Sequence, residues 1–152
     1  MKEIADELKI IAEKYSTELK KISEEAYSFK PSPSKWSKKE ILGHLIDSAQ
    51  NNIRRFIVAQ YEDSPKIVYK QDNWVAIADY QNYPVKDLIM LWLLLNSHAA
   101  LILSHINKET SQRKCDTNDT VPYTIEWLAK DYVKHLLHHL HQILELDPIP
   151  YP

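Results

Sequence analysis

Glycine is almost absent from this chain of 152 residues, in which Gly43 is the single example. β-Hairpins and β-sandwiches need glycine at turns with positive φ, and dinucleotide- or phosphate-binding loops are rich in it. The scarcity of glycine therefore disfavours all-β folds, Rossmann folds and P-loop proteins. A protein built from helices can manage without it.

Cysteine and long apolar runs are also scarce. The single cysteine, Cys115, excludes an internal disulfide and a cysteine-cluster metal site. It lies in a polar stretch without the basic context that lowers a thiol pKa, so we do not expect it to be a nucleophile. No apolar run reaches the length of a membrane span, and the N-terminus is charged and amphipathic, unlike a secretory signal. We therefore expect a cytoplasmic protein with no membrane segment.

The chain also lacks an excess of positive charge. Its net charge is −2, and in "KEIADELKIIAEKYSTELKKISEE" lysines alternate with glutamates. A solvated helix face explains this pattern better than a phosphate-binding stripe, so we expect no nucleic-acid partner. The hydrophobic share of 44% and charged share of 26% are ordinary for a globular protein. At this length we expect one domain, residues 1–152.

Apolar residues recur with helical spacing in four segments. The first covers about residues 2–26 and is followed by two prolines, which block a helix. The second begins at a capping box in "SKKE", with Ser37 as N-cap, and extends to about residue 61. The third follows Pro84 and is strongly apolar. The fourth begins near Thr124 and ends before Pro148.

These segments predict an all-α four-helix bundle with long connections after helices 1, 2 and 3. Such connections leave room for an order other than strict up-and-down. We expect the segment 62–83 to contain a short helix at most and to pack Trp74 and Ile77 on the bundle. The other tryptophans are expected in or beside the core.

Four of the seven histidines occur in "KHLLHHLHQI" near the C-terminus. His135 and His139 are four residues apart and share one helical face. That face continues along a stripe with the spacing of a bundle seam: Leu128, Tyr132, His135, His139, Gln142 and Leu146. The two histidines should therefore point inward, whereas His141 falls off the stripe and should be exposed. His138 lies beside it, nearer the polar flank.

Two inward histidines at this spacing can clamp a metal ion, but a third donor must come from another helix. His44, on the inward side of the second helix, is the best candidate. Gly43 precedes it in mid-helix, where glycine costs about 1 kcal/mol relative to alanine. We expect a close approach there by a ligand or a neighbouring backbone. Simple helix packing at Gly43, and hydrogen-bonded core histidines without a metal, remain the alternatives.

Several polar residues accompany these histidines. The candidates for lining a pocket or hydrogen-bonding the ligands are Ser48, Asn52, Tyr132 and Gln142. For Tyr132, packing is the alternative role. Asp47 and Asn51 are expected at the solvent-exposed surface as readily as in the pocket.

"WSKKEILGHLIDSAQNNIRRF", followed about ninety residues later by "TIEWLAKDYVKHLLHHLHQI", resembles the DinB/YfiT-like superfamily of metalloenzymes. The resemblance covers nearly the whole chain. It implies a four-helix bundle of the family's topology and a site for a divalent metal, zinc or nickel. By motif position the ligands would be His44, His135 and His139. Homodimers are frequent in this group, so a homodimer is expected here.

The resemblance also suggests a reaction, because members of the group include thiol-dependent S-transferases. Three imidazoles leave a coordination position open, and a coordinating thiol is deprotonated at neutral pH. The chain has no inward cysteine, so a low-molecular-weight thiol would be the cosubstrate. We therefore predict transfer of a small thiol to a small-molecule electrophile. The alternatives are metal-assisted hydrolysis and a metal-binding or stress-response module without catalysis.

Overall fold

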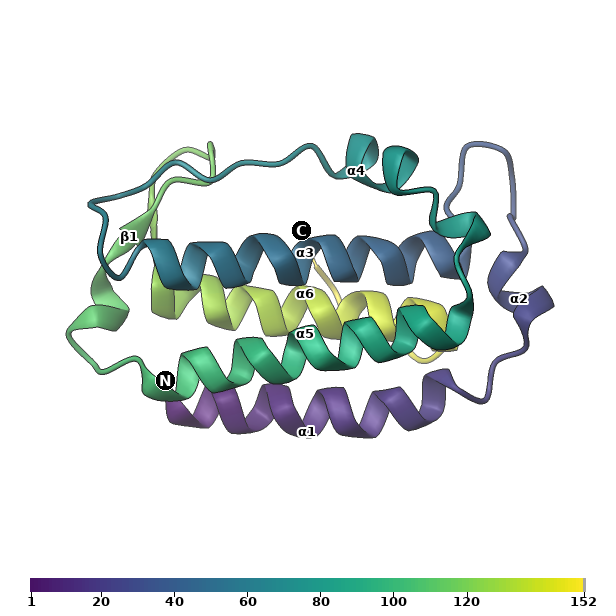
Figure 1. The fold of residues 1–152 in the computed structure, drawn as a ribbon, viewed down its shortest axis with the longest axis horizontal. Coiled ribbons are helices and arrows are strands. Elements are labelled where there is room, and N and C mark those ends of the chain that lie inside the picture. The colour runs from purple at the N-terminus through teal and green to yellow at the C-terminus, as the bar shows by residue number, and fades with distance from the viewer. Residues whose placement is uncertain (152) are drawn as a thin grey trace.

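Four long helices form the body of the protein in a computed structural model that describes residues 1–151 (Figure 1). They are α1 (Lys2–Leu19), α3 (Lys38–Val58), α5 (Val85–His105) and α6 (Ile125–Leu144). Helix α5 packs against α1 and α3, and α6 packs against the same two helices. The predicted all-α four-helix bundle is therefore confirmed.

The order of the helices is not a simple up-and-down one. The connection between α3 and α5 travels the length of the bundle, so these two helices run in the same direction (Figure 1). Helices α1 and α6 run the opposite way. Helices α3 and α6 are therefore antiparallel neighbours, which places the first half of α3 opposite the second half of α6.

Helix α1 is shorter than the sequence predicted, because it ends at Leu19 rather than near residue 26. A turn follows, and Ser23 starts the separate short helix α2 (Glu24–Ser28). The Ser23 side chain accepts a hydrogen bond from the backbone N–H of Ala26. Because Ser23 caps α2, it cannot continue α1. The apolar periodicity of the sequence did not reveal the break between the two helices.

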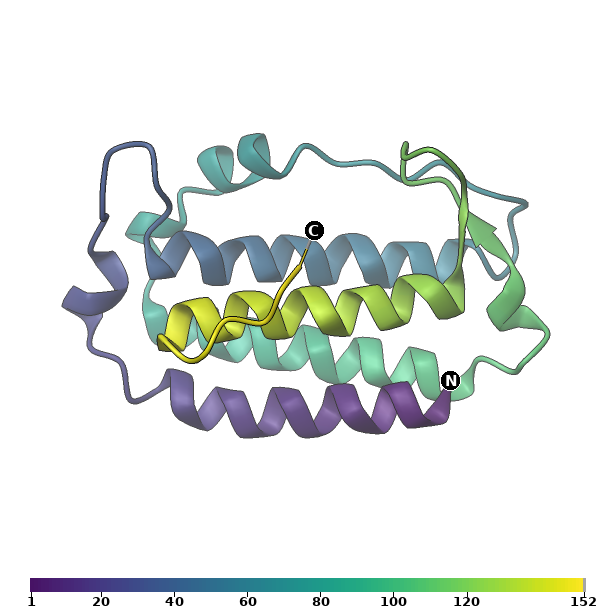
Figure 2. The ribbon, with the colours of Figure 1, turned by 180° about the vertical axis from the view of Figure 1, so that it is seen from behind.

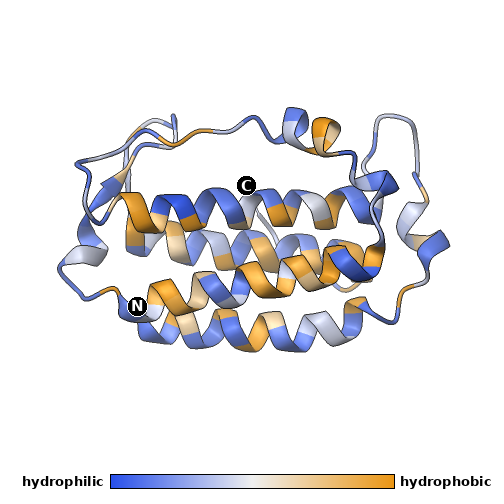
Figure 3. Cartoon of the chain, in the orientation of Figure 1, coloured by the Kyte–Doolittle hydropathy of each residue, from blue (hydrophilic) through white to orange (hydrophobic). Residues whose placement is uncertain are grey.

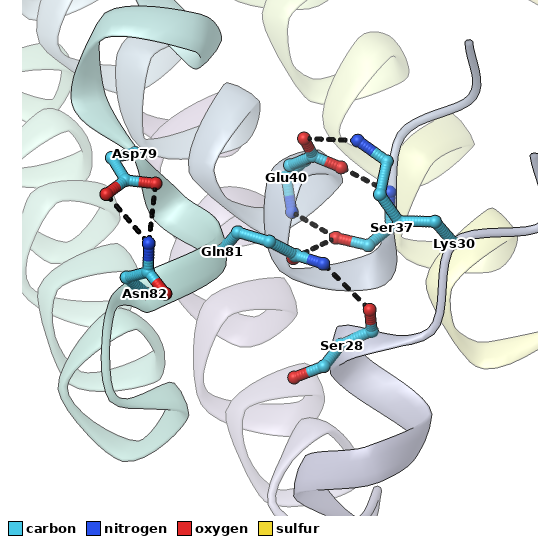
Figure 4. A network of polar contacts seen from close by, with 7 residues as sticks. All are labelled: Ser28, Lys30, Ser37, Glu40, Asp79, Gln81 and Asn82. Atoms are coloured by element: carbon cyan, nitrogen blue, oxygen red, sulfur yellow. Dashed lines mark hydrogen bonds and ion pairs between the residues drawn. The ribbon is translucent and has the colours of Figure 1, made fainter. Parts of the chain in front are cut away.

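The first turn of α3 is held by the capping box that the sequence predicted (Figure 4). Ser37 Oγ accepts from the Glu40 N–H at 3.2 Å, and Glu40 Oε2 accepts from the Ser37 N–H at 2.7 Å. Gln81 ties this turn to two other segments. Its Oε1 accepts from Ser37 Oγ at 2.7 Å, and its Nε2 donates to the Ser28 carbonyl at 2.8 Å. The helix that carries His44 is thus fixed at its start.

The connection between α3 and α5 contains α4 (Gln71–Ala78) and a 3₁₀ turn, η1 (Tyr80–Asn82). The prediction that Trp74 and Ile77 pack on the bundle is wrong: they are 37% and 82% exposed. Val75 and Tyr80 are buried instead. Asp79, in a left-handed conformation with φ 52°, ends α4. The short helix buries only one narrow face, and its apolar content alone did not identify that face.

The connection between α5 and α6 contains a two-stranded antiparallel sheet, β1 (Lys114–Cys115) and β2 (Tyr123–Thr124), which the sequence did not predict. Two-residue strands leave no periodic signal. Cys115 is fully buried there, and its thiol donates to the Pro65 carbonyl at 3.2 Å. Burial raises the pKa of this thiol, which agrees with the expectation that it is not a nucleophile.

Helix α5 is the most apolar helix of the protein (Figure 3). With 21 residues and a mean hydropathy of 1.6 in an 18-residue window, it is long and apolar enough to cross a membrane by length and composition. The core helices of globular proteins pass the same test. Packing explains part of its character, because 39% of that window is buried and Trp92 is fully covered.

Candidate metal centre

The structure brings together the three histidines that the sequence selected. His44, from α3, is 1% exposed, and its Nε2 lies 3.1 Å from Nε2 of His135 on α6. His139 is one helical turn further along α6, with its ring centroid 5.0 Å from that of His44 and 4.6 Å from that of His135. One nitrogen from each ring lies within 4.8 Å of the others.

These separations suit three ligands of one divalent ion. Zinc–nitrogen bonds are about 2.0–2.1 Å, so tetrahedral ligands lie roughly 3.3 Å apart. The 3.1 Å between Nε2 of His44 and Nε2 of His135 is close to this value, and a ring nitrogen of His139 lies within 4.8 Å of a nitrogen of each of the other two. The residues present therefore fit a metal ion.

The protonation of the three rings also suits a metal. Burial, together with the charge of His139, lowers the pKa of His44 to about 4. Burial and the neighbouring histidines lower the pKa of His135 to about 2, and burial also lowers that of His139. All three rings are therefore neutral at pH 7, with a lone pair available to a cation.

One hydrogen bond indicates which nitrogen of His139 is available. Nδ1 of His139 lies 3.0 Å from Oε1 of Gln142, an oxygen that can only accept. Nδ1 therefore carries the proton and Nε2 the lone pair. This is the orienting contact that metal-binding imidazoles usually have, and Gln142 was among the candidates for it.

Behind His44 lies a buried polar pair, Asp47 and Tyr80. The Tyr80 hydroxyl donates to Asp47 Oδ1 at 2.5 Å, and Oδ2 has no hydrogen-bond partner among residues 1–151. Burial raises the pKa of Asp47 to about 6, although the Tyr80 bond lowers it in part. Surface positions for Asp47 and Asn51 are excluded, because both are at least 95% buried. Asn51 donates back to the Asp47 carbonyl at 2.9 Å, as helical polar residues do when they face inward.

Tyr80 also explains the glycine in mid-helix. A Cβ placed on Gly43 would lie 2.0 Å from Cδ2 and 2.3 Å from Cγ of Tyr80. A close approach was expected at this position, and the structure shows that an aromatic ring makes it. Sequence reasoning missed Tyr80. The signal that pointed to it was the glycine itself, which gave the place of the contact but not its partner.

A small cavity of about 190 Å³, the polar cavity, lies beside His135. Its walls include Ser48, Asn52 and Tyr132, which were proposed as pocket residues. Tyr132 contributes its ring, since its hydroxyl is committed to Asn96 Oδ1 at 2.7 Å. The sequence gave no indication of the remaining walls: Arg55, Tyr69, Gln71, Asp131 and Tyr151.

A larger cavity of about 660 Å³ reaches the site from the side of His139 and Gln142. Apolar residues from the segment between α1 and α3 form much of it, including Phe29 and Trp36. The ring of Trp36 lies 5.2 Å from the ring of His44. The three imidazoles can thus be approached from two cavities, a small polar one and a larger one lined by both apolar and charged residues.

The remaining histidines of α6 take no part in the cluster. His141 was expected to be exposed, but it is half-buried between the Tyr15 hydroxyl (3.0 Å) and the Asp147 carbonyl (2.8 Å). His138 Nδ1 lies 2.6 Å from the Ile149 carbonyl. Both histidines hold the C-terminal tail, which folds back along α6 (Figure 2). The sequence showed the tail only as an extended segment.

The fold and the histidine cluster define a helical-bundle protein with a candidate metal site, and comparisons with known proteins agree. The family model described as the DinB superfamily matches residues 7–143. The chain therefore belongs to the DinB superfamily.

Two relatives can be described individually. A protein from Halalkalibacterium halodurans named a "putative metal-dependent hydrolase" is 27% identical over 109 residues, 71% of this chain and 63% of that protein. The match thus spans less than two thirds of the relative's length. The solved structure of YfiT from Bacillus subtilis superposes with a TM-score of 0.79 and 23% identity, covering 93% of this chain and 84% of that one. Its description is "a probable metal-dependent hydrolase with an unusual four-helix bundle topology".

Proposed function

We propose that this protein is a metal-dependent hydrolase of a small molecule, in which His44, His135 and His139 hold one divalent ion. The observation that carries the proposal is the convergence of three neutral imidazoles from two helices, of which His44 is buried and the other two are half-buried. The names of the two relatives support the same reaction class. Imidazole ligands suit zinc and nickel alike, so we propose that the ion is zinc or nickel.

A divalent ion bound by three histidines would keep a coordination position open, act as a Lewis acid and lower the pKa of bound water towards 7. The protein's own residues prepare the site for it. Gln142 holds the His139 proton on Nδ1, and Trp36 covers the ring of His44. Tyr80 packs against Gly43 and fixes the segment of α3 behind His44. Such supports restrict ring rotation and keep water from one side.

The two cavities would accommodate the two parts of a substrate whose hydrolysable bond lies at the three histidines. His139 borders the larger cavity and His135 the polar cavity. A substrate that spans the cluster would therefore place an apolar part near Trp36 and a polar part near Ser48 and Asn52. A small molecule with a hydrolysable bond between two such parts fits this arrangement.

Thiol transfer, the first prediction from the sequence, has less support than hydrolysis. Neither relative's name mentions a thiol, and both name hydrolysis. The thiol cosubstrate, the homodimer and the cytoplasmic location stay predictions. The chain's single thiol, on Cys115, is buried against Pro65.

The proposal is tested with untagged protein loaded with zinc or nickel and a panel of chromogenic esters, amides and phosphate esters. We expect hydrolysis of at least one bond type that requires metal, is lost in His135→Ala and survives in His141→Ala. A second arm supplies small thiols with a generic electrophile. Acceleration in that arm alone would replace the hydrolase by a transferase, and metal binding without turnover in either arm would favour a non-catalytic module.

A further inference from the structure

The polar cavity beside His135 contains two opposite charges that do not pair with each other. Arg55 comes from α3 and Asp131 from α6, and both side chains are half-buried. The ion pairs among residues 1–151 all join a lysine to a glutamate, so neither Arg55 nor Asp131 has an oppositely charged group within 4.0 Å. Half-buried charges without an oppositely charged partner lose part of their hydration, and hydrogen bonds to neutral groups replace it only in part.

The guanidinium of Arg55 has N–H groups that donate no hydrogen bond within residues 1–151. Its Nε and Nη2 donate to the Ile67 carbonyl at 3.3 and 3.1 Å, and its Nη1 donates to Asn52 Oδ1 at 3.4 Å. A guanidinium carries five N–H groups, so these contacts use three of them. The Ile67 and Asn52 contacts hold the group in place, and the remaining N–H groups are available to an anion.

Asp131 is similarly held on one side. Its Oδ2 accepts a hydrogen bond from the Tyr151 hydroxyl at 2.9 Å, and Oδ1 has no hydrogen-bond partner among residues 1–151. Tyr151 belongs to the C-terminal tail, and its ring lies 5.1 Å from that of His135. The tail thus closes one wall of the cavity and fixes the carboxylate with the same side chain.

A route from the surface leads to these charges. Arg55, Asp131 and Tyr151 also line a neighbouring cavity of about 350 Å³. That cavity extends to Asp119 and Trp127, which are exposed. The two charges therefore stand where an outer cavity meets the inner one that borders His135.

We propose that the polar cavity binds the zwitterionic head group of a small molecule, an ammonium and a carboxylate on one carbon as in an α-amino acid. The carboxylate would pair with Arg55 and the ammonium with Asp131. A simple anion would meet repulsion from Asp131, and a simple cation repulsion from Arg55, so only a ligand with both charges satisfies both residues.

The size of the cavity agrees with a head group of this kind. Its volume of about 190 Å³ corresponds to roughly six waters at about 30 Å³ each, which is the scale of a small amino acid. The assignment of this ligand as a substrate rests on the proposed hydrolase function. In that case the head group would lie beside His135, and the rest of the molecule would extend past the imidazoles. Binding of the head group itself requires only the cavity.

The test uses the full metal-free chain, so that binding is measured independently of metal and hydrolysis. L-Alanine, propionate and ethylamine are compared by chemical-shift changes in ¹⁵N-labelled protein, a method suited to weak ligands. We expect saturable shifts at the polar cavity with L-alanine and at least tenfold weaker binding of the other two. Propionate or ethylamine binding as tightly as L-alanine, or no saturable shift with L-alanine, would overturn the proposal.

A variant isolates the contribution of the Asp131 charge. Asp131→Asn should weaken L-alanine binding at least tenfold without weakening propionate binding, since only the ammonium loses its partner. Arg54→Met, which removes a charge at an exposed position that does not line the polar cavity, is the control and should leave binding unchanged. Equal binding of L-alanine by Asp131→Asn and the parent protein would contradict the assignment. A chain that binds L-alanine but never hydrolyses a substrate would refute the hydrolase and leave the site standing.

Discussion

Replacement of Gly43 by alanine should destabilise the protein, although alanine is the better helix former. The new Cβ would overlap Cδ2 and Cγ of Tyr80 at 2.0 and 2.3 Å. Cγ is bonded to the Tyr80 Cβ, so rotation of the ring cannot remove the overlap and the residue must shift. Overpacking of this kind costs about 1–3 kcal/mol. The shift would also break the Tyr80–Asp47 hydrogen bond, worth about 1.5–3 kcal/mol for a charged acceptor.

Helix propensity offsets about 1 kcal/mol of this loss. The net destabilisation expected for Gly43→Ala is therefore about 1.5–5 kcal/mol, which lowers the Tm by roughly 3–20 °C in a chain of this size. Thermal melting followed by circular dichroism, together with urea unfolding, measures both quantities.

The matched control is the same substitution in a Tyr80→Ala background. Without the ring, the alanine at position 43 meets no obstacle and should stabilise the protein by about 1 kcal/mol. The effect of Gly43→Ala should thus change sign between the two backgrounds. An equal loss of stability in both would show that Tyr80 is not the reason for the glycine.

Three further outcomes follow from the same contacts. Because burial lowers the pKa of His44 from 6.5 to about 4, the unfolded chain binds more protons than the folded one between these two pH values. The free energy of unfolding of the metal-free protein, measured with urea, should therefore fall by up to about 3 kcal/mol from this group as the pH falls from 6.5 to 4. His44→Gln should make the free energy of unfolding less dependent on pH in this range. Ser37→Ala should cost about 1 kcal/mol in thermal melting through loss of the N-cap, whereas Ser34→Ala, at an exposed position, should cost almost nothing. Tyr80→Phe should raise the pKa of Asp47 further, since the lost hydrogen bond favours the carboxylate; an unchanged or lower value in a carboxyl NMR titration would contradict the role given to Tyr80.

The sequence could predict the histidine cluster because each part of the inference was local. Helical periodicity put His135 and His139 on one face, and the capping box at Ser37 defined where α3 begins. The third member, His44, came from an inward stripe next to an unusual glycine. Spacing within a helix determines which side chains share a face, so the shared face predicted from the sequence is also found in the folded structure.

The surroundings of the cluster could not be predicted in the same way, because they depend on segments without a period. Tyr80 reaches α3 from a long connection whose path is set by tertiary packing and by a left-handed turn at Asp79. Tyr151 reaches the polar cavity because the tail folds back along α6. His141 was expected to be exposed because its position on α6 was considered without the tail and α1, which cover it.

The central claim, one divalent ion held by three imidazoles, is tested most directly by the metal content of untagged protein after equilibration with zinc and removal of unbound ion. We expect about one ion per chain in the parent protein and in His141→Ala, and almost none in His135→Ala, with both variants folded by circular dichroism. A parent protein that retains no zinc or nickel, or a His135→Ala variant that retains as much as His141→Ala, would contradict the account.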